Sequence, residues 1–474
     1  MPTVKVPLFT KSYTSIDDTV LSDDAAIQYN GFLDDLEGLN VRPGEVLALN
    51  TAKRIDGMFF WPDKNFILCV EEGAYALRTV SGEILNTSFV GPLTFPASNL
   101  VTFCNDGSRV FMAGGGKINY VNEFGVATEL ADADAPTAVT HVAFLDGYIL
   151  AIDGLSGKFY WSDIPVNTDW SALNFATAEG SPDNTISMAV VQRQIYLLGT
   201  ASTEIWENNG SDPFSRIPGG LIEVGCGAKY SPIKRDNSLM WLTNKRQIVE
   251  FTGTGLEYIS AKYDKVLADL TIVSDCIGAL IIKDGQEFCL FHFPAEQRTL
   301  VYDPAAKDWS EWGNWDESGM TWLPYDIRAS VYDSVSGKTF IGKSNAKVIA
   351  CLSSDSRVDL TGVATTRLFK FLRRIGHIDH STNKIKRVEE LTFRVKRGAN
   401  SSYTPPKLML RYRNNGSSHW SNIREIDLGA TGNTEHVVKL CRLGMFKSRQ
   451  YEISATDNVP LVFSSAESDI TVIR

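Results

Sequence analysis

The 474-residue sequence lacks long apolar runs and paired cysteine motifs, and we expect no secretory leader. No apolar stretch approaches the ~20 residues that a membrane-spanning helix needs, so we expect no membrane span. The N-terminus carries no apolar segment followed by a small-residue cleavage site, which argues against secretion. Seven cysteines are scattered without Cys-x-x-Cys spacing. We therefore expect buried free thiols in a protein made in a reducing cytoplasm.

Motifs that carry catalysis are also missing. The run Gly114–Lys117 resembles a phosphate loop, but Phe111 and Ile118 stand where a Walker motif needs glycine and a hydroxyl residue. His377 and His380 are three apart, so on a strand they would point to opposite faces, and no Cys or acidic cluster completes a metal site. No Gly-x-Ser-x-Gly elbow occurs. We predict no enzyme activity, catalytic residue, cofactor or metal.

What the sequence does contain is a repeated hairpin, in which a polar turn and a short apolar strand are followed by a second turn and strand. One such hairpin cannot bury its apolar face alone, so copies in series must pack against one another. Their recurrence suits the four-stranded blades of a β-propeller. Seven copies begin at Asp63, Asn105, Leu145, Val191, Arg235, Cys276 and Ser336.

The expected fold is all-β: a β-propeller of six or seven blades followed by a β-sandwich-like domain. We place an N-terminal arm at residues 1–45, the propeller at 46–360 and a basic C-terminal β domain at 361–474. In the last segment, Phe393 and Val395 alternate with Arg394 and Lys396. This period of two predicts half-buried strands with a charged outer face.

Charge is unevenly distributed along the chain. Its net charge is −10, yet residues 367–449 contain 18 Lys and Arg against 6 Asp and Glu. Such polarity indicates self-assembly, binding to an acidic partner, or DNA binding without sequence specificity. The alternative is that basic residues protect edge strands from aggregation. The candidate assembly or DNA-facing surface comprises Arg373, Arg374, Lys384, Lys386, Arg387, Arg394, Lys396, Arg397, Arg411 and Arg413.

Two segments rich in Trp, Pro, Gly and Asp, residues 162–184 and 313–325, are expected to be long loops that contact partners. Tryptophans clustered near the second segment either stack on a sugar or pack at a blade edge, and packing is favoured. Loop aspartates could pair as acid and base for glycoside cleavage, although acidic loops are common. The candidate contact residues are Asp163, Trp170, Asp183, Trp309, Trp312 and Trp315.

Several long motifs resemble the packaged-DNA stabilisation family, the tail hub or nozzle proteins of short-tailed bacteriophages. They are DAPTAVTHVAFLDGYILA (134–151), NFATAEGSPDN (174–184), FSRIPGGLIEVGC (214–226), RTLVYDPAAKDWSEWG (298–313), RRIGHIDHSTNKIKR (373–387), PKLMLRYRNNGSSHWSN (406–422) and RLGMFKSRQYEIS (442–454). The resemblance implies a virion tail protein without catalytic residues. It further implies a hexameric ring below the portal and adaptor proteins that retains packaged DNA, anchors tail fibres or spikes and conducts double-stranded DNA at ejection. The alternative is a carbohydrate-binding or carbohydrate-degrading propeller in the tail.

Overall fold

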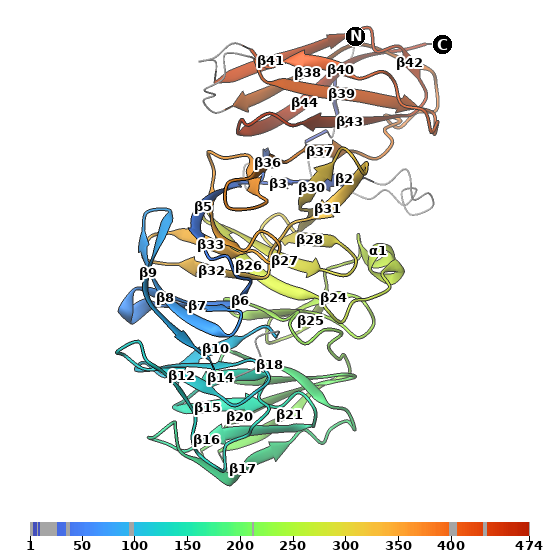
Figure 1. The fold of residues 1–474 in the computed structure, drawn as a ribbon. Helices are drawn as coiled ribbons and strands as arrows, with labels where there is room; N and C mark the ends of the chain where they lie inside the picture. Colours follow the sequence, from blue (N-terminus) through green and yellow to red (C-terminus); the bar gives the residue numbers. More distant parts are fainter. Residues whose placement is uncertain are drawn as a thin grey trace.

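The computed structural model describes residues 3–6, 8–9, 26–34, 38–93, 99–210, 213–397, 405–429 and 434–473. These residues form strands almost throughout (Figure 1). Their helical elements are one short helix, α1 (Asp264–Asp269), and a 3-10 turn at Pro62–Lys64. No helix in these ranges is long and apolar enough to cross a membrane.

Seven antiparallel blades of four strands surround one axis. Six of them are separate four-stranded sheets, and the other forms one side of a nine-stranded sheet. The blades confirm the propeller, with seven blades in the described chain. Blade 1 consists of β6 (Ile55–Trp61), β7 (Phe66–Glu71), β8 (Ala74–Ser81) and β9 (Ile84–Pro92); blade 2 of β10 (Thr102–Asn105), β11 (Val110–Ala113), β12 (Asn119–Val121) and β13 (Ala127–Glu129); and blade 3 of β14 (His141–Leu145), β15 (Tyr148–Ile152), β16 (Lys158–Ser162) and β17 (Trp170–Thr177). Blade 4 consists of β18 (Thr185–Val191), β19 (Gln194–Gly199), β20 (Thr203–Asn208) and β21 (Phe214–Ile222); and blade 5 of β22 (Ile233–Arg235), β23 (Ser238–Leu242), β24 (Ile248–Phe251) and β25 (Leu256–Tyr258). Blade 6 consists of β26 (Ile277–Lys283), β27 (Gln286–Phe293), β28 (Arg298–Asp303) and β29 (Asp308–Glu311); and blade 7 of β32 (Ala329–Asp333), β33 (Lys338–Gly342), β34 (Val348–Ser353) and β5 (Gly44–Asn50).

Turn chemistry explains why the hairpins form locally. Asp146 and Gly147 join β14 to β15 with φ of 49° and 95°, and Asp284 and Gly285 join β26 to β27 with 52° and 82°. Positive φ at both central residues is the geometry of a type I′ turn, whose twist matches the strands that it joins. Each hairpin recognised in the sequence is present as two adjacent strands of one blade.

The propeller core lies between blades rather than inside any one of them. Each of seven apolar clusters draws its buried residues from two neighbouring blades. Ile55 and Phe60 of the first blade, for example, pack with Phe340 and Ile349 of the last. A blade alone would expose these faces, so the ring is stable only when closed.

Closure depends on a strand from the N-terminal part of the chain. β5 pairs antiparallel with β34, so the seventh blade combines three strands from near residue 340 with one from near residue 47. Ala48 of β5 is buried in the same cluster as Cys351 of β34.

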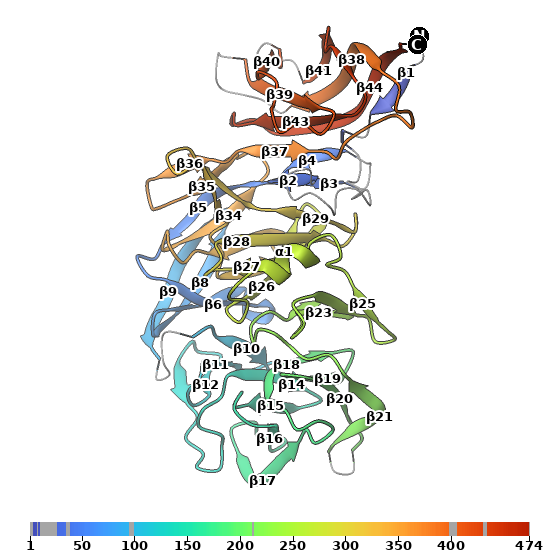
Figure 2. The ribbon, with the colours of Figure 1, turned by 90° about the vertical axis from the view of Figure 1, so that its right-hand side faces the viewer.

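The C-terminal strands form two packed sheets at one end of the molecule, and blades 3 and 4 lie at the other end (Figures 1 and 2). A shared apolar core joins the sheets, as expected for a sandwich-like domain. Two small hairpins lie between this body and the propeller, β30 (Gly313–Asp316) with β31 (Thr321–Pro324), and β35 (Val358–Leu360) with β36 (Thr366–Leu368). The seven-stranded sheet contains β1 (Thr3–Val6), β3 (Gly31–Leu33), β4 (Leu39–Val41), β38 (Lys386–Arg397), β41 (Glu435–Cys441), β42 (Met445–Phe446) and β44 (Leu461–Val472).

The nine-stranded sheet connects the two bodies. Outermost strand β29 of the sixth blade pairs parallel with β2, and β2 pairs with β37 of the C-terminal body. The sheet therefore continues from the propeller axis into the C-terminal body without a break. Beyond β29 it contains β2 (Ile27–Tyr29), β37 (Phe371–Arg374), β43 (Arg449–Ala455), β39 (Lys407–Asn414) and β40 (Arg424–Asp427).

N-terminal residues are incorporated into both bodies. β1 pairs with β44, and Phe9 stacks on Phe463 with 5.0 Å between ring centroids. Residues 10–25 of the expected arm lie outside the described residues. The domain limits at 45 and 360 stay predictions, because the strand pairing interlaces the three expected segments.

Both segments expected to be loops contain strands, which corrects that expectation. β17 occupies residues 170–177, and the β30–β31 hairpin occupies most of 313–325. In β17 the register shifts opposite Tyr160 and Ser162, so the strand is bulged. Such a bulge obscures the alternating pattern that would reveal a strand in the sequence.

Candidate functional sites

A buried ion pair joins the chain just before the first propeller strand, β5, to the chain just after the last one, β34. Arg42 donates to both carboxylate oxygens of Asp359, at 2.9 and 2.5 Å, and both side chains are almost completely buried. Arg42 Nε also donates to Asn30 Oδ1 at 2.8 Å. The amide of Asn30 in turn donates to the carbonyls of Gly313 and Lys370. One guanidinium thus links four segments that are distant in sequence.

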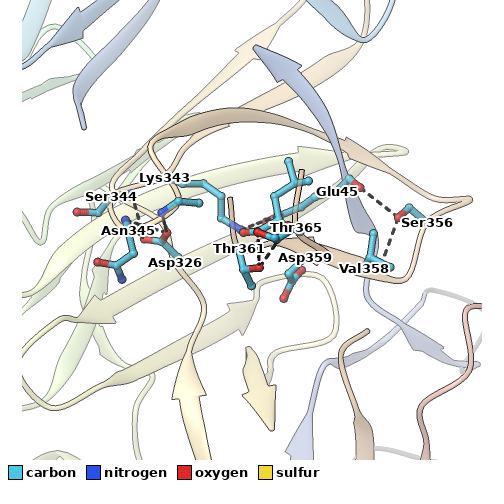
Figure 3. A network of polar contacts seen from close by, with 12 residues as sticks. Glu45, Asp326, Lys343, Ser344, Asn345, Ser356, Val358, Asp359, Thr361 and Thr365 are labelled. Carbon is cyan, nitrogen blue, oxygen red and sulfur yellow. Dashed lines mark hydrogen bonds and ion pairs between the residues drawn. The ribbon is translucent and has the colours of Figure 1, made fainter. Parts of the chain in front are cut away.

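A second buried ion pair, between Lys343 and Glu45, lies near Asp359 of the first pair (Figure 3). Lys343 Nζ donates to Glu45 Oε2 at 2.5 Å and to the Leu360 carbonyl at 3.0 Å. Burial raises the pKa of Glu45, and the charge of Lys343 opposes that rise. Nearby, Asp326 accepts backbone N–H groups of residues 344–346 and fixes the β33–β34 turn. We call the two ion pairs, Arg42–Asp359 and Lys343–Glu45, the propeller clasp.

The propeller axis is a channel of about 810 Å³ lined by the innermost strand of every blade. The chain segment leading to the fifth blade crosses this channel. Tyr230 donates from its hydroxyl to the Leu100 carbonyl, before the second blade, at 3.2 Å. The Lys229 carbonyl lies 3.0 Å from Nε2 of His141 in the third blade. The segment therefore lies across the channel, and we call residues 229–230 the plug.

His141 is buried at this plug and stays neutral. Burial is the main cause that lowers its pKa to about 4. Its ring nitrogens lie within hydrogen-bond distance of Thr140 Oγ1 and the Lys229 carbonyl, and Ser187 Oγ is 3.3 Å from Nε2. The side chain links two blades and the plug without carrying a charge.

The sequence predicted that ten basic residues form an exposed surface, and the structure corrects this prediction for four of them. Arg373, Lys386, Arg397 and Arg413 are buried. Lys386 shows the reason, since it points inward and donates to the carbonyls of Asp379 and Thr382.

The other six basic candidates are at least partly exposed, but most are paired with acids. Arg374 and Arg411 share Glu452, at 2.7 and 2.6 Å. Arg387 pairs with Glu389, and Arg394 lies 3.4 Å from Glu435. Only Lys384 and Lys396 are exposed with no ion pair to another described residue. The basic candidates come from several strands, and the structure brings three of them together: the guanidinium carbons of Arg374, Arg411 and Arg413 lie 5.1, 4.7 and 4.9 Å from the centroid of the Trp420 ring.

Most of the expected contact residues are structural. Trp170, Trp309 and Trp312 are buried in cores between blades. Asp183 accepts the backbone N–H groups of residues 201 and 202, and Asp163 accepts the Asn174 amide. Trp315 differs, because it is half-buried and lines a cavity.

Sequence reasoning missed the clasp and the plug. Arg42 and Asp359 are 317 positions apart, and Glu45 and Lys343 are 298 apart. No local pattern identifies such partners. The only available signal was charged residues placed beside strongly apolar strands, which is also common on surfaces.

Comparison with known proteins supports the family but carries little further detail. A family model described as "Bacteriophage P22 Gp10, beta-propeller", of the phage-stabilisation type, matches residues 79–357. No curated protein matches the chain.

Solved structures with similarity include "Structure of U3-55K" (10% identity, TM-score 0.43, covering 65% of this chain and 99% of that one) and "Crystal structure of RRP9 WD40 repeats" (10%, 0.42, 66% and 99%). A third is "Crystal Structure of the N-terminal Domain of Nup159" (9%, 0.43, 69% and 99%). Similarity this low carries no argument about function. The family match covers more than half of the chain and confirms the resemblance seen in its motifs, and the chain therefore belongs to the phage-stabilisation family of P22 Gp10 β-propeller proteins.

Proposed function

We propose that the protein is a structural subunit of a short-tailed phage tail, the hub or nozzle. Copies form a ring, expected to be hexameric, below the portal and adaptor proteins. The ring retains packaged DNA, holds tail fibres or spikes and conducts the genome at ejection. Membership of a phage structural family supports a place in the virion. Assembly takes place in the host cytoplasm.

The plugged axis is the observation that carries this proposal. Tyr230 lies across the propeller axis and bonds to the Leu100 carbonyl, so the axis offers no open path for double-stranded DNA. DNA must then pass between subunits, through a lumen that only several copies can enclose. The clasp and the nine-stranded sheet support this role, because they make each subunit a stiff building block.

Charge polarity supports assembly as well. A segment rich in Lys and Arg coexists with an acidic remainder in one chain. Head-to-tail contacts in a ring join unlike surfaces, and opposite charges favour such contacts. An acidic lumen would also allow DNA to slide, because it would not bind phosphates.

Localisation in the particle tests the proposal. Electron cryomicroscopy of virions carrying a tagged copy should place the protein in a ring below the portal. Mass spectrometry of purified virions should find it at a fixed ratio to the portal protein. If purified, infectious virions lacked the protein, the proposal would be wrong.

A further inference from the structure

A surface cavity of about 390 Å³ lies where the propeller meets the C-terminal body. Three elements enclose it: the outer strands of the sixth blade, β2, and the β30–β31 hairpin. The sixth blade and β2 belong to one continuous sheet, and the β30–β31 hairpin is a separate two-stranded sheet that follows β29 directly in the chain. The four tryptophans that are close together in the sequence differ in exposure. Trp309 and Trp312 are buried, whereas Trp315 and Trp322 are partly exposed.

Aromatic rings form one corner of the cavity. Tyr29 and Trp322 stack in parallel with centroids 3.8 Å apart and an interplanar angle of 2°. Trp315 meets Trp322 nearly edge-on, at 5.4 Å and 65°. Since Tyr29 covers one face of Trp322, the part of the indole that lines the cavity lies on its other side or edge. The stack also fixes the ring orientation before any ligand arrives.

Polar groups of both signs face these rings. Arg298 donates to Glu311 through Nε at 3.2 Å and Nη2 at 2.7 Å, and Glu311 is 6% exposed. Burial, followed by the charge of Glu311, raises the pKa of Tyr29, so its hydroxyl stays protonated. Gln297 and Thr321 add neutral donors and acceptors at the exposed rim.

This combination suits a sugar ring. A pyranose presents an apolar C–H face that packs on indoles and a rim of hydroxyl groups that both donate and accept hydrogen bonds. A matched guanidinium–carboxylate pair serves such hydroxyls without attracting a free charge. We propose that this cavity binds a neutral saccharide unit, with Trp315 and Trp322 as the stacking surface and the Arg298–Glu311 pair as the hydroxyl-binding floor.

The same features disfavour other ligands and cleavage. Arg298 is neutralised by Glu311 and offers no free charge to a phosphate or polyanion. A second cation beside the rings is Lys370, whose Nζ lies 4.9 Å from the centroid of the Trp315 ring and so covers part of that indole. Glycoside cleavage needs two carboxyl groups facing one bond. Here Glu311 is paired, and Glu296 accepts the N–H groups of Thr271 and Ile272. The site is a binding site without hydrolysis.

Ligand-observed NMR with the full-length protein tests the proposal. A panel of methyl glycosides of glucose, galactose, mannose, rhamnose and N-acetylglucosamine is screened by saturation transfer. At least one is expected to bind, and titration gives its dissociation constant. Trp322→Ala is expected to weaken that binding about tenfold or more. Gln297→Ala, a change at an exposed position on the rim of the cavity, is expected to weaken it several-fold.

Trp420→Ala provides the matched control. Trp420 is also half-buried but belongs to the C-terminal body, where it lies over Arg411 at 4.7 Å. This variant should bind the glycoside as the wild type does. The proposal is overturned if no glycoside of the panel binds, or if Trp420→Ala weakens binding as much as Trp322→Ala.

Discussion

At the scale of single residues, the stability of the molecule depends on charges that have been removed from water. Arg42 is enclosed by Phe369, Tyr325 and Trp312, with its guanidinium carbon 3.8, 4.8 and 5.5 Å from their ring centroids. Its only carboxylate partner among the described residues is Asp359. Desolvation of both ions is tolerable only because the pair is complete and fully hydrogen-bonded.

Breaking this pair should therefore destabilise the protein strongly. We expect Arg42→Met to lower the free energy of unfolding by about 3–5 kcal/mol, because Asp359 is left buried and charged. Urea denaturation followed by tryptophan fluorescence measures the change. The double variant Arg42→Met/Asp359→Leu should recover most of the loss. Equal instability of the single and double variants would contradict the account.

The neutral histidine at the plug predicts a pH dependence. His141 titrates near pH 6.5 in the unfolded chain but at about 4 when folded. Above pH 6.5 both states are neutral and the full stability is present. As pH falls toward 4 only the unfolded state gains the proton, so stability falls by up to about 3 kcal/mol.

Unfolding midpoints measured from pH 7 to pH 4 check this dependence. His141→Gln keeps hydrogen-bonding groups but removes the titration, so its stability should change less over this range. The pH dependence of stability that remains in His141→Gln is expected from His292, because burial also lowers the pKa of His292 to about 4. An unchanged slope in His141→Gln would show that the site does not carry the effect.

The basic side chains of β38 show how far the alternation of apolar and charged residues predicts which side chains are exposed. Alternation in β38 places Phe393 and Val395 inward with Arg394 and Lys396 outward, as expected. The same alternation places Arg397 inward, so strand phase argued against including it in a surface. Lys386 instead shares the phase of Arg394 and Lys396, and it is buried because the register of β38 shifts between Val388 and Glu390, which the sequence did not reveal. Arg373 gave no such signal, because its burial results from packing between two bodies.

At the scale of elements, β5 decides whether the propeller is closed. Ala48→Asp places a charge in the core between the seventh and first blades and should release this strand. Cys351 of the neighbouring β34 is buried, and burial raises its pKa to about 11. Its reaction with a maleimide should therefore accelerate several-fold in the variant, as measured by mass spectrometry of labelled peptides.

Two comparisons make the release specific. Cys226 lies in the core between the fourth and fifth blades and should stay protected in Ala48→Asp. Ala172→Asp changes an exposed alanine in β17 and should leave Cys351 unreactive. Labelling of Cys226 and Cys351 at equal rates would indicate general unfolding rather than release of β5.

The elements also show what could be predicted from sequence. The seven hairpins were predictable because their turns and apolar strands are local, and seven copies implied a ring. Closure by β5 and the pairing of β2 with β29 were not predictable, because each joins strands separated by about 300 residues. The cavity beside Trp322 was hidden for the same reason, since Tyr29 and the tryptophans meet only in the folded chain.

At the scale of the whole molecule, the uneven charge predicts salt-sensitive assembly. Contacts between a basic region and an acidic neighbour weaken as salt shortens the Debye length, from about 10 Å at 0.1 M to 3 Å at 1 M. Sedimentation velocity at fixed protein concentration should show larger assemblies at low salt than at high salt. Self-association that strengthens with salt would instead indicate an apolar interface.

Two routes for the DNA can be distinguished by experiment: the channel along the axis of each propeller, or a lumen enclosed by several subunits. If DNA leaves between subunits, then opening the plug has no effect on genome release. Phage carrying Tyr230→Ala should eject DNA at the wild-type rate, because the hydroxyl that reaches Leu100 serves the fold and not transport. Ala143→Trp, which narrows the same channel from the third blade, should likewise leave ejection unchanged in particles that assemble. Fluorescence of a DNA dye after receptor-triggered release measures both rates. Faster ejection in Tyr230→Ala together with slower ejection in Ala143→Trp would place the genome in the propeller axis and refute a lumen formed by the ring.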